Sequence, residues 1–223
     1  MNKPLWQPSQ QRIHSAQITR FREDLQASGC AIGETYEALH RWSVENPAQF
    51  WEAVWRFGDG VGEGDHQPVL VDGDQFPGAR RFPNTRLNFA ENLLRHRDER
   101  PALVSLLENG DRRELSYSQL YLRVAQLASA LRKLGVAPGD RVAGFLPNIE
   151  EAVVAMLAAT SLGAVWSSCS PDFGINGVMD RFGQIQPKVL FAADGYYYNG
   201  KACDSLQRLA EIRAQIDSIE QVV

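Results

Sequence analysis

Cysteine is scarce in this chain of 223 residues, which has three, at Cys30, Cys169 and Cys203, and no Cys-x-x-Cys pair. An odd number of widely spaced cysteines indicates neither a disulfide framework nor a zinc site. This usage is typical of a reducing compartment, so the sequence predicts a cytoplasmic protein. The longest apolar candidate, residues 152–166, is interrupted by polar residues and falls short of the roughly 20 residues that a membrane span needs.

An excess of positive charge is also missing. Lys and Arg number 23 against 27 Asp and Glu, which gives a formal net charge of −4. Nucleic-acid binding normally shows a basic patch, so we expect no nucleic-acid partner and no membrane partner. The start of the chain, Met1 to Trp6, has no apolar run before a small-residue cleavage site, so we expect no signal peptide. Nothing in the composition indicates an oligomeric state.

Residues for catalysis are few. All four histidines precede residue 100, so no base is indicated beside the serines and the cysteine of residues 167–170. The glycines of residues 58–64 have no strand before them, no helix after them and only acidic neighbours, which excludes a phosphate-binding loop there. We predict no catalytic residue and no metal ligand in this sequence.

Helical patterns dominate the first 100 residues. One helix is expected over residues 35–42, and a second starts at Asn46-Pro47 and ends at Gly58. We interpret the tryptophan-containing apolar stripe of this second helix as its core-facing side, docked on a neighbouring domain. A further helix is expected from Asn84. The sequence thus predicts a helical N-terminal extension over residues 1–100.

Strands and helices alternate from Pro101 onward. The turn signal Asn109-Gly110-Asp111 predicts a hairpin, and a capping box at Ser116 opens a helix. Further strands are expected over 141–146, 164–168, 189–192 and 221–223, and helices over 149–162, 176–185 and 203–216. This alternation predicts the α/β class, with the first part of a mainly parallel sheet over residues 101–223. A last strand without continuation would leave an apolar edge unpaired, so we expect a truncated domain.

Two strand ends could bind a ligand, because ligands of open α/β sheets lie outside the carboxyl ends of the strands. The first is residues 167–172, where the ordinary interpretation is hydrogen bonding to the strand end, with Asp172 or Asn176 capping the next helix. The second is Tyr196–Lys201, where aromatics beside a lysine could hold an adenine ring and a phosphate. Tyrosines that simply pack on the sheet edge are an equally weighted alternative.

Several segments carry a family resemblance. Residues 115–120 (LSYSQL) with 131–142 (LRKLGVAPGDRV) resemble the opening of the adenylate-forming superfamily of acyl-CoA synthetases. Residues 36–55 and 87–94 resemble the N-terminal extension of the acetyl-CoA and acetoacetyl-CoA synthetases. Three further segments, residues 6–9, 163–174 and 198–201, resemble the acetoacetyl-CoA synthetase pattern. The resemblance covers essentially the whole chain.

The resemblance implies an acid–thiol ligase that uses ATP and Mg²⁺ to form an acyl-adenylate and then transfers the acyl group to CoA, with acetoacetate as the acid. Residues 101–223 would then be the start of an AMP-binding domain. The Ser/Thr/Gly-rich phosphate loop of the family, which ends in Pro-Lys, does not occur in this sequence, so we expect the 223 residues alone to be inactive. Two alternatives stay open: a related acetyl- or propionyl-CoA synthetase, and a non-catalytic CoA-binding module.

The resemblance also implies at most part of a CoA site. The loop Ser170-Pro171-Asp172 corresponds to one that approaches CoA in the acetyl-CoA synthetases. Two arginines that hold CoA phosphates there correspond to Tyr198 and Lys201. Lys201 keeps one positive charge without the bidentate fork of arginine, and Tyr198 loses the other.

Overall fold

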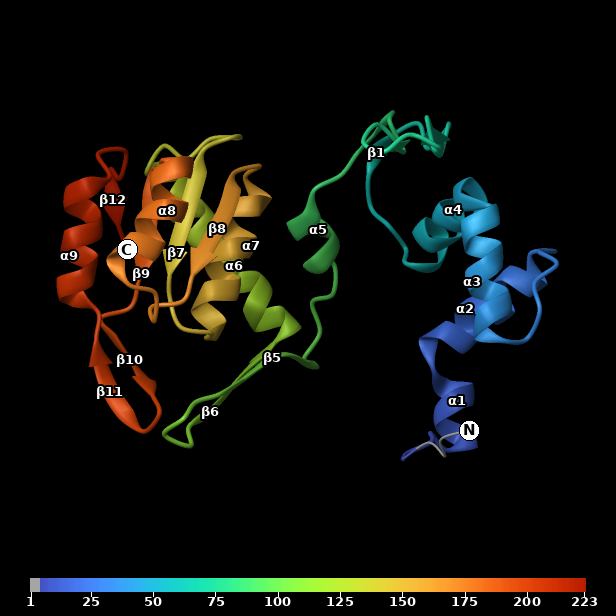
Figure 1. Cartoon of the computed structure of the whole chain (residues 1–223), viewed down its shortest axis with the longest axis horizontal. Helices are drawn as coiled ribbons and strands as arrows, with labels where there is room; N and C mark the ends of the chain where they lie inside the picture. The colour runs from blue at the N-terminus through green and yellow to red at the C-terminus, as the bar shows by residue number, and fades with distance from the viewer. Residues whose placement is uncertain (1–4) are drawn as a thin grey trace. The chain divides into compact units, whose positions relative to one another are not determined.

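The computed structural model describes residues 5–223 and divides into two compact units, Met1–Leu87 and Asn88–Val223 (Figure 1). Residues 1–4, part of the start that lacks a signal-peptide pattern, lie outside the described residues. The assignment of residues 1–100 to an extension and 101–223 to an AMP-binding domain stays a prediction.

The first unit contains four helices in its described residues, followed by short strand pairs. The helices are α1 (Gln10–Ser15), α2 (Gln17–Ala27), α3 (Tyr36–Glu45) and α4 (Pro47–Phe57). The Thr35 side chain accepts a hydrogen bond from Ala38 N–H and so caps α3. Pro47 occupies the first turn of α4 and Gly58 follows its end, as the sequence predicts.

The apolar stripe of α4 packs inside the first unit. Phe50 and Val54 lie against a buried cluster that joins α2, α3 and α4 and contains Phe21, Leu25, Ile32, Leu39 and Ala53. Trp51 lies beneath the Arg81 guanidinium, whose central carbon is 4.9 Å from the ring centroid. Trp55 meets the His66 ring at a centroid distance of 4.8 Å. The core-facing interpretation is therefore confirmed for Phe50 and Val54, whereas Trp51 and Trp55 pack on Arg81 and His66 outside that cluster. Docking on a neighbouring domain stays a prediction.

The helix expected from Asn84 is wrong over its first residues. Thr85 and Arg86 form β4 (Thr85–Arg86), which pairs antiparallel with β1 (Glu63–Gly64), and the amide of Asn84 donates to the Gln67 carbonyl. A second pair joins β2 (Leu70–Val71) to β3 (Arg80–Arg81). The helix begins in the second unit as α5 (Phe89–Leu93), because the Asn88 side chain accepts from Glu91 N–H.

The second unit has the predicted α/β architecture. It opens with an antiparallel hairpin of β5 (Pro101–Leu106) and β6 (Arg112–Ser116), followed by α6 (Tyr117–Lys133). The rest is β7 (Arg141–Phe145), α7 (Glu150–Ser161), β8 (Val165–Cys169), α8 (Ile175–Ile185), β9 (Val189–Ala192), β10 (Gly195–Tyr198), β11 (Lys201–Asp204), α9 (Leu206–Gln215) and β12 (Gln221–Val222). Four strands form a parallel sheet in the order β12-β9-β7-β8.

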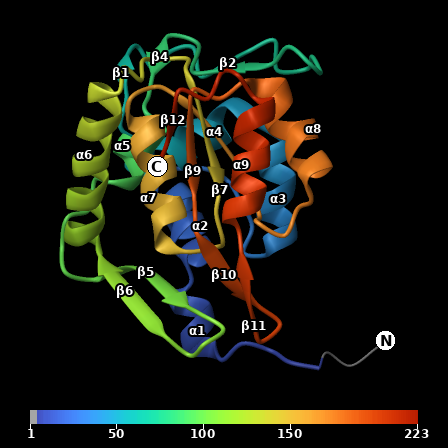
Figure 2. The same ribbon diagram turned by 90° about the vertical axis from the view of Figure 1, so that its left-hand side faces the viewer.

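Helices cover both faces of this sheet, as Figure 2 shows for α6 and α7 on one side and α8 and α9 on the other. Successive residues of β9 alternate between two cores: Val189 faces the cluster with α6 and α7, and Leu190 faces the cluster with α8 and α9. In β7, Val142 likewise faces the cluster with α6 and α7, and Phe145 faces the cluster with α8 and α9. Burial on both faces explains why these strands are continuous apolar runs.

Two side chains brace the amino end of the sheet. Arg141 donates from Nε to the Ile185 carbonyl at 2.8 Å and from Nη2 to the Gln186 carbonyl at 3.1 Å, which satisfies the last turn of α8. The Lys188 ammonium donates to the Gly135 carbonyl at 2.8 Å, beyond the end of α6. The crossover helices are thus tied to the strand starts on both faces.

Three helix starts differ from expectation. The helix expected from residue 149 begins as α7 at Glu150, and Ile149 is its N-cap residue, without a side-chain hydrogen bond. Gly174 precedes α8, so neither Asp172 nor Asn176 caps it. The last helix begins at Leu206 rather than residue 203, because residues 201–204 pair as β11 with β10.

Candidate functional site

The candidate site lies where the strand order reverses. From β7 the chain passes through α7 to β8, and then through α8 to β9 on the other side of β7. Loops that leave the carboxyl ends in opposite directions open a crevice at such a point, and ligands bind there. A cleft of about 790 Å³ occupies this place, lined by Pro147, Asn148 and Ile149 after β7 and by Ala193 and Asp194 after β9.

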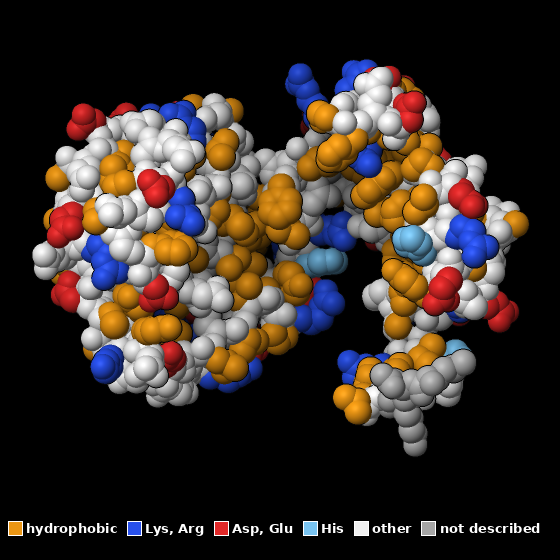
Figure 3. Space-filling model, viewed as in Figure 1, with side chains coloured by type: hydrophobic (Ala, Val, Ile, Leu, Met, Phe, Trp, Pro, Cys, Tyr) orange, Lys and Arg blue, Asp and Glu red, His pale blue; other side chains and the backbone are white. Residues whose placement is uncertain are grey.

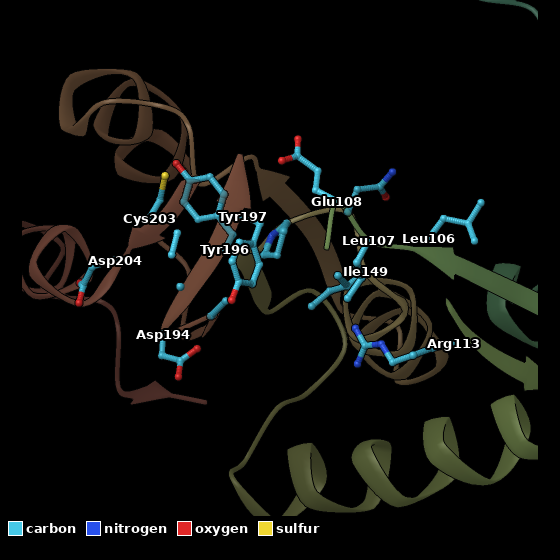
Figure 4. A pocket seen from close by; sticks show the side chains of 15 residues that line it. Leu106, Leu107, Glu108, Arg113, Ile149, Asp194, Tyr196, Tyr197, Cys203 and Asp204 are labelled. Atoms are coloured by element: carbon cyan, nitrogen blue, oxygen red, sulfur yellow. The ribbon is translucent and has the colours of Figure 1, made fainter. Parts of the chain in front are cut away.

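Two hairpins flank the cleft, and Figure 1 shows both projecting from the same end of the second unit. Figure 4 shows Glu108 and Arg113 of the β5–β6 hairpin on one side and Tyr196, Tyr197 and Cys203 of the β10–β11 hairpin on the other. The walls are therefore built from segments about 90 residues apart in sequence.

An ion-pair network anchors the first hairpin. Arg113 lies 3.2 Å from Glu150 through Nε and 3.1 Å from Glu151 through Nη1. Ser105 Oγ donates to Glu150 Oε2 at 2.6 Å, so the carboxylate of Glu150, which is only 4% exposed, has two partners. Both acids lie in the first turn of α7, where the helix dipole favours negative charge.

The second hairpin turns at Asn199 and Gly200, whose φ angles of 50° and 72° are those of a type I′ turn. The backbone N–H groups of both residues donate to the Glu108 carboxylate, each at 3.2 Å. The tips of the two hairpins are therefore joined at the rim of the cleft.

The predicted Ser170-Pro171-Asp172 loop follows β8 and is held by neighbouring elements. Tyr196 Oη donates to the Pro171 carbonyl at 3.4 Å, and Arg208 Nη1 of α9 donates to the same oxygen. Ser170 Oγ donates to Asp172 Oδ2 at 3.1 Å. The structure thus links this loop to the hairpin that carries the other predicted residues.

Two groups near the loop have raised pKa values. Burial, followed by the nearby Asp172 carboxylate, raises the pKa of Tyr196 above its ordinary value, and the Arg208 guanidinium opposes this only in part. Burial likewise raises the pKa of the Cys169 thiol at the end of β8. Tyr196 therefore stays a hydrogen-bond donor at neutral pH, and the thiolate of Cys169 is disfavoured.

Comparison with known proteins places the second unit. A family model described as AMP-binding enzyme matches residues 89–223, more than half of the chain. The chain belongs to the AMP-binding enzyme family. A second model, described as acetyl-coenzyme A synthetase N-terminus, matches residues 36–93. The resemblance inferred from the sequence is confirmed.

Individual relatives agree with this assignment. The acetoacetyl-coenzyme A synthetase of Rhizobium meliloti (strain 1021) is 44% identical over 91% of this chain and 31% of its own length. A malonamoyl-CoA synthetase of Penicillium aethiopicum is 37% identical over 98% of this chain and 31% of its own. A solved acetoacetyl-CoA synthetase from Streptomyces lividans is 45% identical with a TM-score of 0.91, covering 99% of this chain and 35% of that one. The chain spans about a third of the length of these relatives.

The five predicted site residues of this chain fall into two groups. Ser170, Pro171 and Asp172 form the loop after β8. Tyr198 and Lys201 are register partners at the tip of the β10–β11 hairpin, where both side chains are exposed. They therefore lie on two neighbouring elements rather than in one cluster, and within residues 5–223 no hydrogen bond or salt bridge joins the Lys201 side chain to the loop.

The charges around the cleft decide how an anionic cofactor fits. Glu108, Asp194 and Asp204 line it, while its one lining cation, Arg113, is already paired with two carboxylates. Lys201 forms no salt bridge with any described residue and lies at the hairpin tip. Carboxylates would repel a phosphate group within the cleft. At the hairpin tip, Glu108 accepts from the N–H groups of Asn199 and Gly200, and the exposed ammonium of Lys201 is the group there that can attract a phosphate.

Three observations concern other ligands. Within residues 5–223, no group of three or more His, Cys, Asp or Glu side chains is placed to hold a metal ion. No helix among the described residues is long and apolar enough to cross a bilayer. On the face that Figure 3 shows, Lys and Arg side chains are interspersed with Asp and Glu side chains.

Sequence reasoning missed four residues of the site: Glu108, Arg113, Tyr196 as a hydrogen-bond donor, and Arg208. A signal for the second hairpin was present, because Asn199-Gly200 is the preferred dipeptide of a two-residue hairpin turn. The sequence patterns instead predict a loop over residues 196–201 and a helix from residue 203. Arg208 carried no local signal, since its partners lie 35 and 37 residues away.

Proposed function

We propose that this chain is the N-terminal part of an ATP-dependent acid–thiol ligase that converts acetoacetate, ATP and CoA to acetoacetyl-CoA, AMP and pyrophosphate through an acyl-adenylate. The observation that carries the proposal is the match to the Streptomyces lividans enzyme, which extends over 99% of this chain at 45% identity. Two family models in chain order, an acetyl-CoA synthetase N-terminus followed by an AMP-binding enzyme, support it.

The acid is proposed to be a short chain with a carbonyl on its third carbon. Acetoacetate and malonamate share that carbonyl and differ by a methyl group in place of an amino group, and relatives named for both acids match nearly the whole chain. Acetate and propionate, the alternative acids, lack it. A pocket that hydrogen-bonds this oxygen would reject acids without it, because its own polar group would be left unpaired.

ATP, Mg²⁺ and CoA are the proposed cofactors of the whole enzyme. In this chain, Ser170, Pro171, Asp172, Tyr198 and Lys201 are proposed to supply part of the CoA site. The exposed ammonium of Lys201 supports a phosphate contact, and exposed Tyr198 offers a ring for stacking. When bound, CoA would supply the thiol that accepts the acyl group, and these residues would orient it.

The proposed partners are small molecules, in a cytoplasmic protein with neither a nucleic-acid nor a membrane partner. The three cysteines are all free in the structure, which supports a reducing compartment.

The test uses the full-length protein with acetoacetate, malonamate, acetate and propionate as competing acids. We expect acetoacetate-dependent formation of AMP and a CoA thioester, with a kcat/KM for acetoacetate well above that for acetate and propionate. A preference for acetate or propionate would instead assign the protein to the related synthetases. CoA binding without turnover of any acid would favour a non-catalytic CoA-binding module.

A further inference from the structure

We propose that Tyr196 and Arg208 are positioning residues that set the orientation of the Ser170–Asp172 loop for the CoA step. This inference rests on the proposed function, because the loop has a role in the thioester step only if it contacts CoA.

The contacts within the loop set its shape. Ser170 Oγ donates to Asp172 Oδ2, Asp172 N–H donates to Ser170 Oγ at 3.4 Å, and Phe173 N–H closes the turn on the Ser170 carbonyl at 3.2 Å. Gly174 precedes α8 without a side-chain cap, so no cap side chain ties the loop to that helix. The orientation of the turn relative to the sheet therefore depends on donors from other elements.

Two donors from different elements meet at one acceptor of the loop. The Pro171 carbonyl accepts from Tyr196 Oη of β10 and from Arg208 Nη1 of α9. The same guanidinium nitrogen lies 3.5 Å from the Phe173 carbonyl, so Arg208 contacts both ends of the turn. Pro171 itself is fully buried, which leaves its ring no freedom to move once the carbonyl is held.

The chemistry of this contact indicates alignment rather than general core packing. An apolar pair would fill the same space without the cost of taking a hydroxyl and a guanidinium half out of water. Hydrogen bonds to a carbonyl fix direction, and one of these donors is charged, which makes its bond stronger than a neutral one. Burial and a hydrogen bond with the Asp172 carboxylate raise the pKa of Tyr196, so the same hydroxyl also contacts a side chain of the loop.

The proposal predicts different effects on the two half-reactions, which are formation of the acyl-adenylate and transfer of the acyl group to CoA. If the loop acts only in the CoA step, loss of either donor should leave formation of the adenylate unchanged. Thioester formation needs the loop in place and should show a raised KM for CoA. We expect about a fivefold rise for Tyr196→Phe, which removes one neutral hydrogen bond, and about a tenfold or larger rise for Arg208→Met, which removes a charged donor.

The experiment uses the full-length enzyme and measures acetoacetate-dependent ATP–pyrophosphate exchange beside CoA thioester formation. Arg208→Lys should recover part of the loss, because an ammonium can reach one carbonyl but not span two. Arg213→Met is the matched control, since Arg213 is exposed on the same helix and forms no salt bridge among the described residues. It should leave both reactions unchanged.

Hydrogen exchange of the backbone at residues 172–174 supplies a readout that does not depend on activity. The expected result is faster exchange there in Tyr196→Phe and Arg208→Met, together with a raised KM for CoA and unchanged pyrophosphate exchange. An unchanged KM for CoA, or an equal fall in both half-reactions, overturns the positioning role. A wild-type enzyme that forms no thioester overturns the proposed function instead, while the exchange data still decide whether the pair orders the loop.

Discussion

Glu108 accepts a hydrogen bond at 3.2 Å from the backbone N–H of Gly200, 92 residues further along the chain. Its other carboxylate oxygen accepts from Asn199 N–H at the same distance. One acid thus joins the tips of the β5–β6 and β10–β11 hairpins. Because a two-stranded hairpin is marginally stable by itself, this contact should govern how far the second hairpin opens.

Replacement of Glu108 tests that contact. Glu108→Ala should lower the local opening free energy of residues 195–204 by about 1 kcal/mol, since an exposed charge-assisted pair of hydrogen bonds is lost. Hydrogen exchange of those amides is the measurement. The opening free energy of Glu108→Gln should lie between those of the wild type and Glu108→Ala, because the amide oxygen of glutamine still accepts a hydrogen bond. Glu114→Ala, an exposed acid on the same hairpin, is the control, and equal exchange in both alanine variants would contradict the prediction.

Arg113 and Arg112 are adjacent, yet their removal should have very different effects. Arg113→Ala leaves Glu150, which is 4% exposed, with Ser105 as its partner, and should destabilise the second unit by about 2 kcal/mol. Arg112 pairs with Glu114, and both side chains are substantially exposed, so Arg112→Ala should cost less than about 0.5 kcal/mol. Urea denaturation compares the two variants, and similar midpoints would argue against a structural role for the Glu150 network.

Two glycines should respond to alanine with opposite signs. A Cβ on Gly144 would lie 2.7 Å from the indole ring of Trp166, so Gly144→Ala should destabilise the sheet by about 2 kcal/mol. A Cβ on Gly183 would meet only Met179 at 3.8 Å, inside α8, and Gly183→Ala should stabilise by about 0.5 to 1 kcal/mol. Thermal denaturation of the two variants measures whether each melting temperature rises or falls relative to the wild type. A stabilised Gly144→Ala variant would show that Trp166 moves freely.

Stability should fall at alkaline pH through Cys169. Burial raises the pKa of this thiol above its ordinary value of 9.0, so the unfolded chain loses the proton at lower pH than the folded chain does. The contribution of the Cys169 thiol to the free energy of unfolding is therefore complete below about pH 9, and it is lost as the pH rises through the pKa of the thiol in the folded protein. Tyr196 adds an effect of the same sign above its ordinary value of 10.0.

Urea midpoints between about pH 7 and pH 10 measure this dependence. Cys169→Ala should lower stability at neutral pH and reduce the loss at alkaline pH. A pH dependence as steep in the variant as in the wild type would assign the effect to other groups. In the native wild type, Cys169 should also react with a thiol reagent more slowly than Cys30 and Cys203, which are less buried.

The fold of the second unit was predictable because its signals are local. The capping box at Ser116 forms as expected, with Gln119 returning a hydrogen bond to the cap residue. Apolar runs such as Val189–Ala192 are bounded by polar turns and form buried strands. Both signals depend on neighbours within a few residues.

The site was less predictable because its contacts are long-range. Arg208, Glu108 and Arg113 each find these partners at least 35 residues away, and periodicity contains no information about such pairs. The predicted helix start at Asn84 is wrong for a related reason. The residues after it have helical spacing, but Thr85 and Arg86 pair as a strand with Gly64 and Glu63. Tertiary pairing overrode local propensity.

Arg141 and Lys188 give the sheet a fixed end and a freer one. Their bonds to the carbonyls of Ile185, Gln186 and Gly135 clamp the strand starts, whereas the opposite end carries the hairpins and the loop after β8. Spectroscopic labels placed beside Arg141 should therefore hold a constant separation when a ligand binds. That edge is the internal reference against which displacement of the hairpins can be measured.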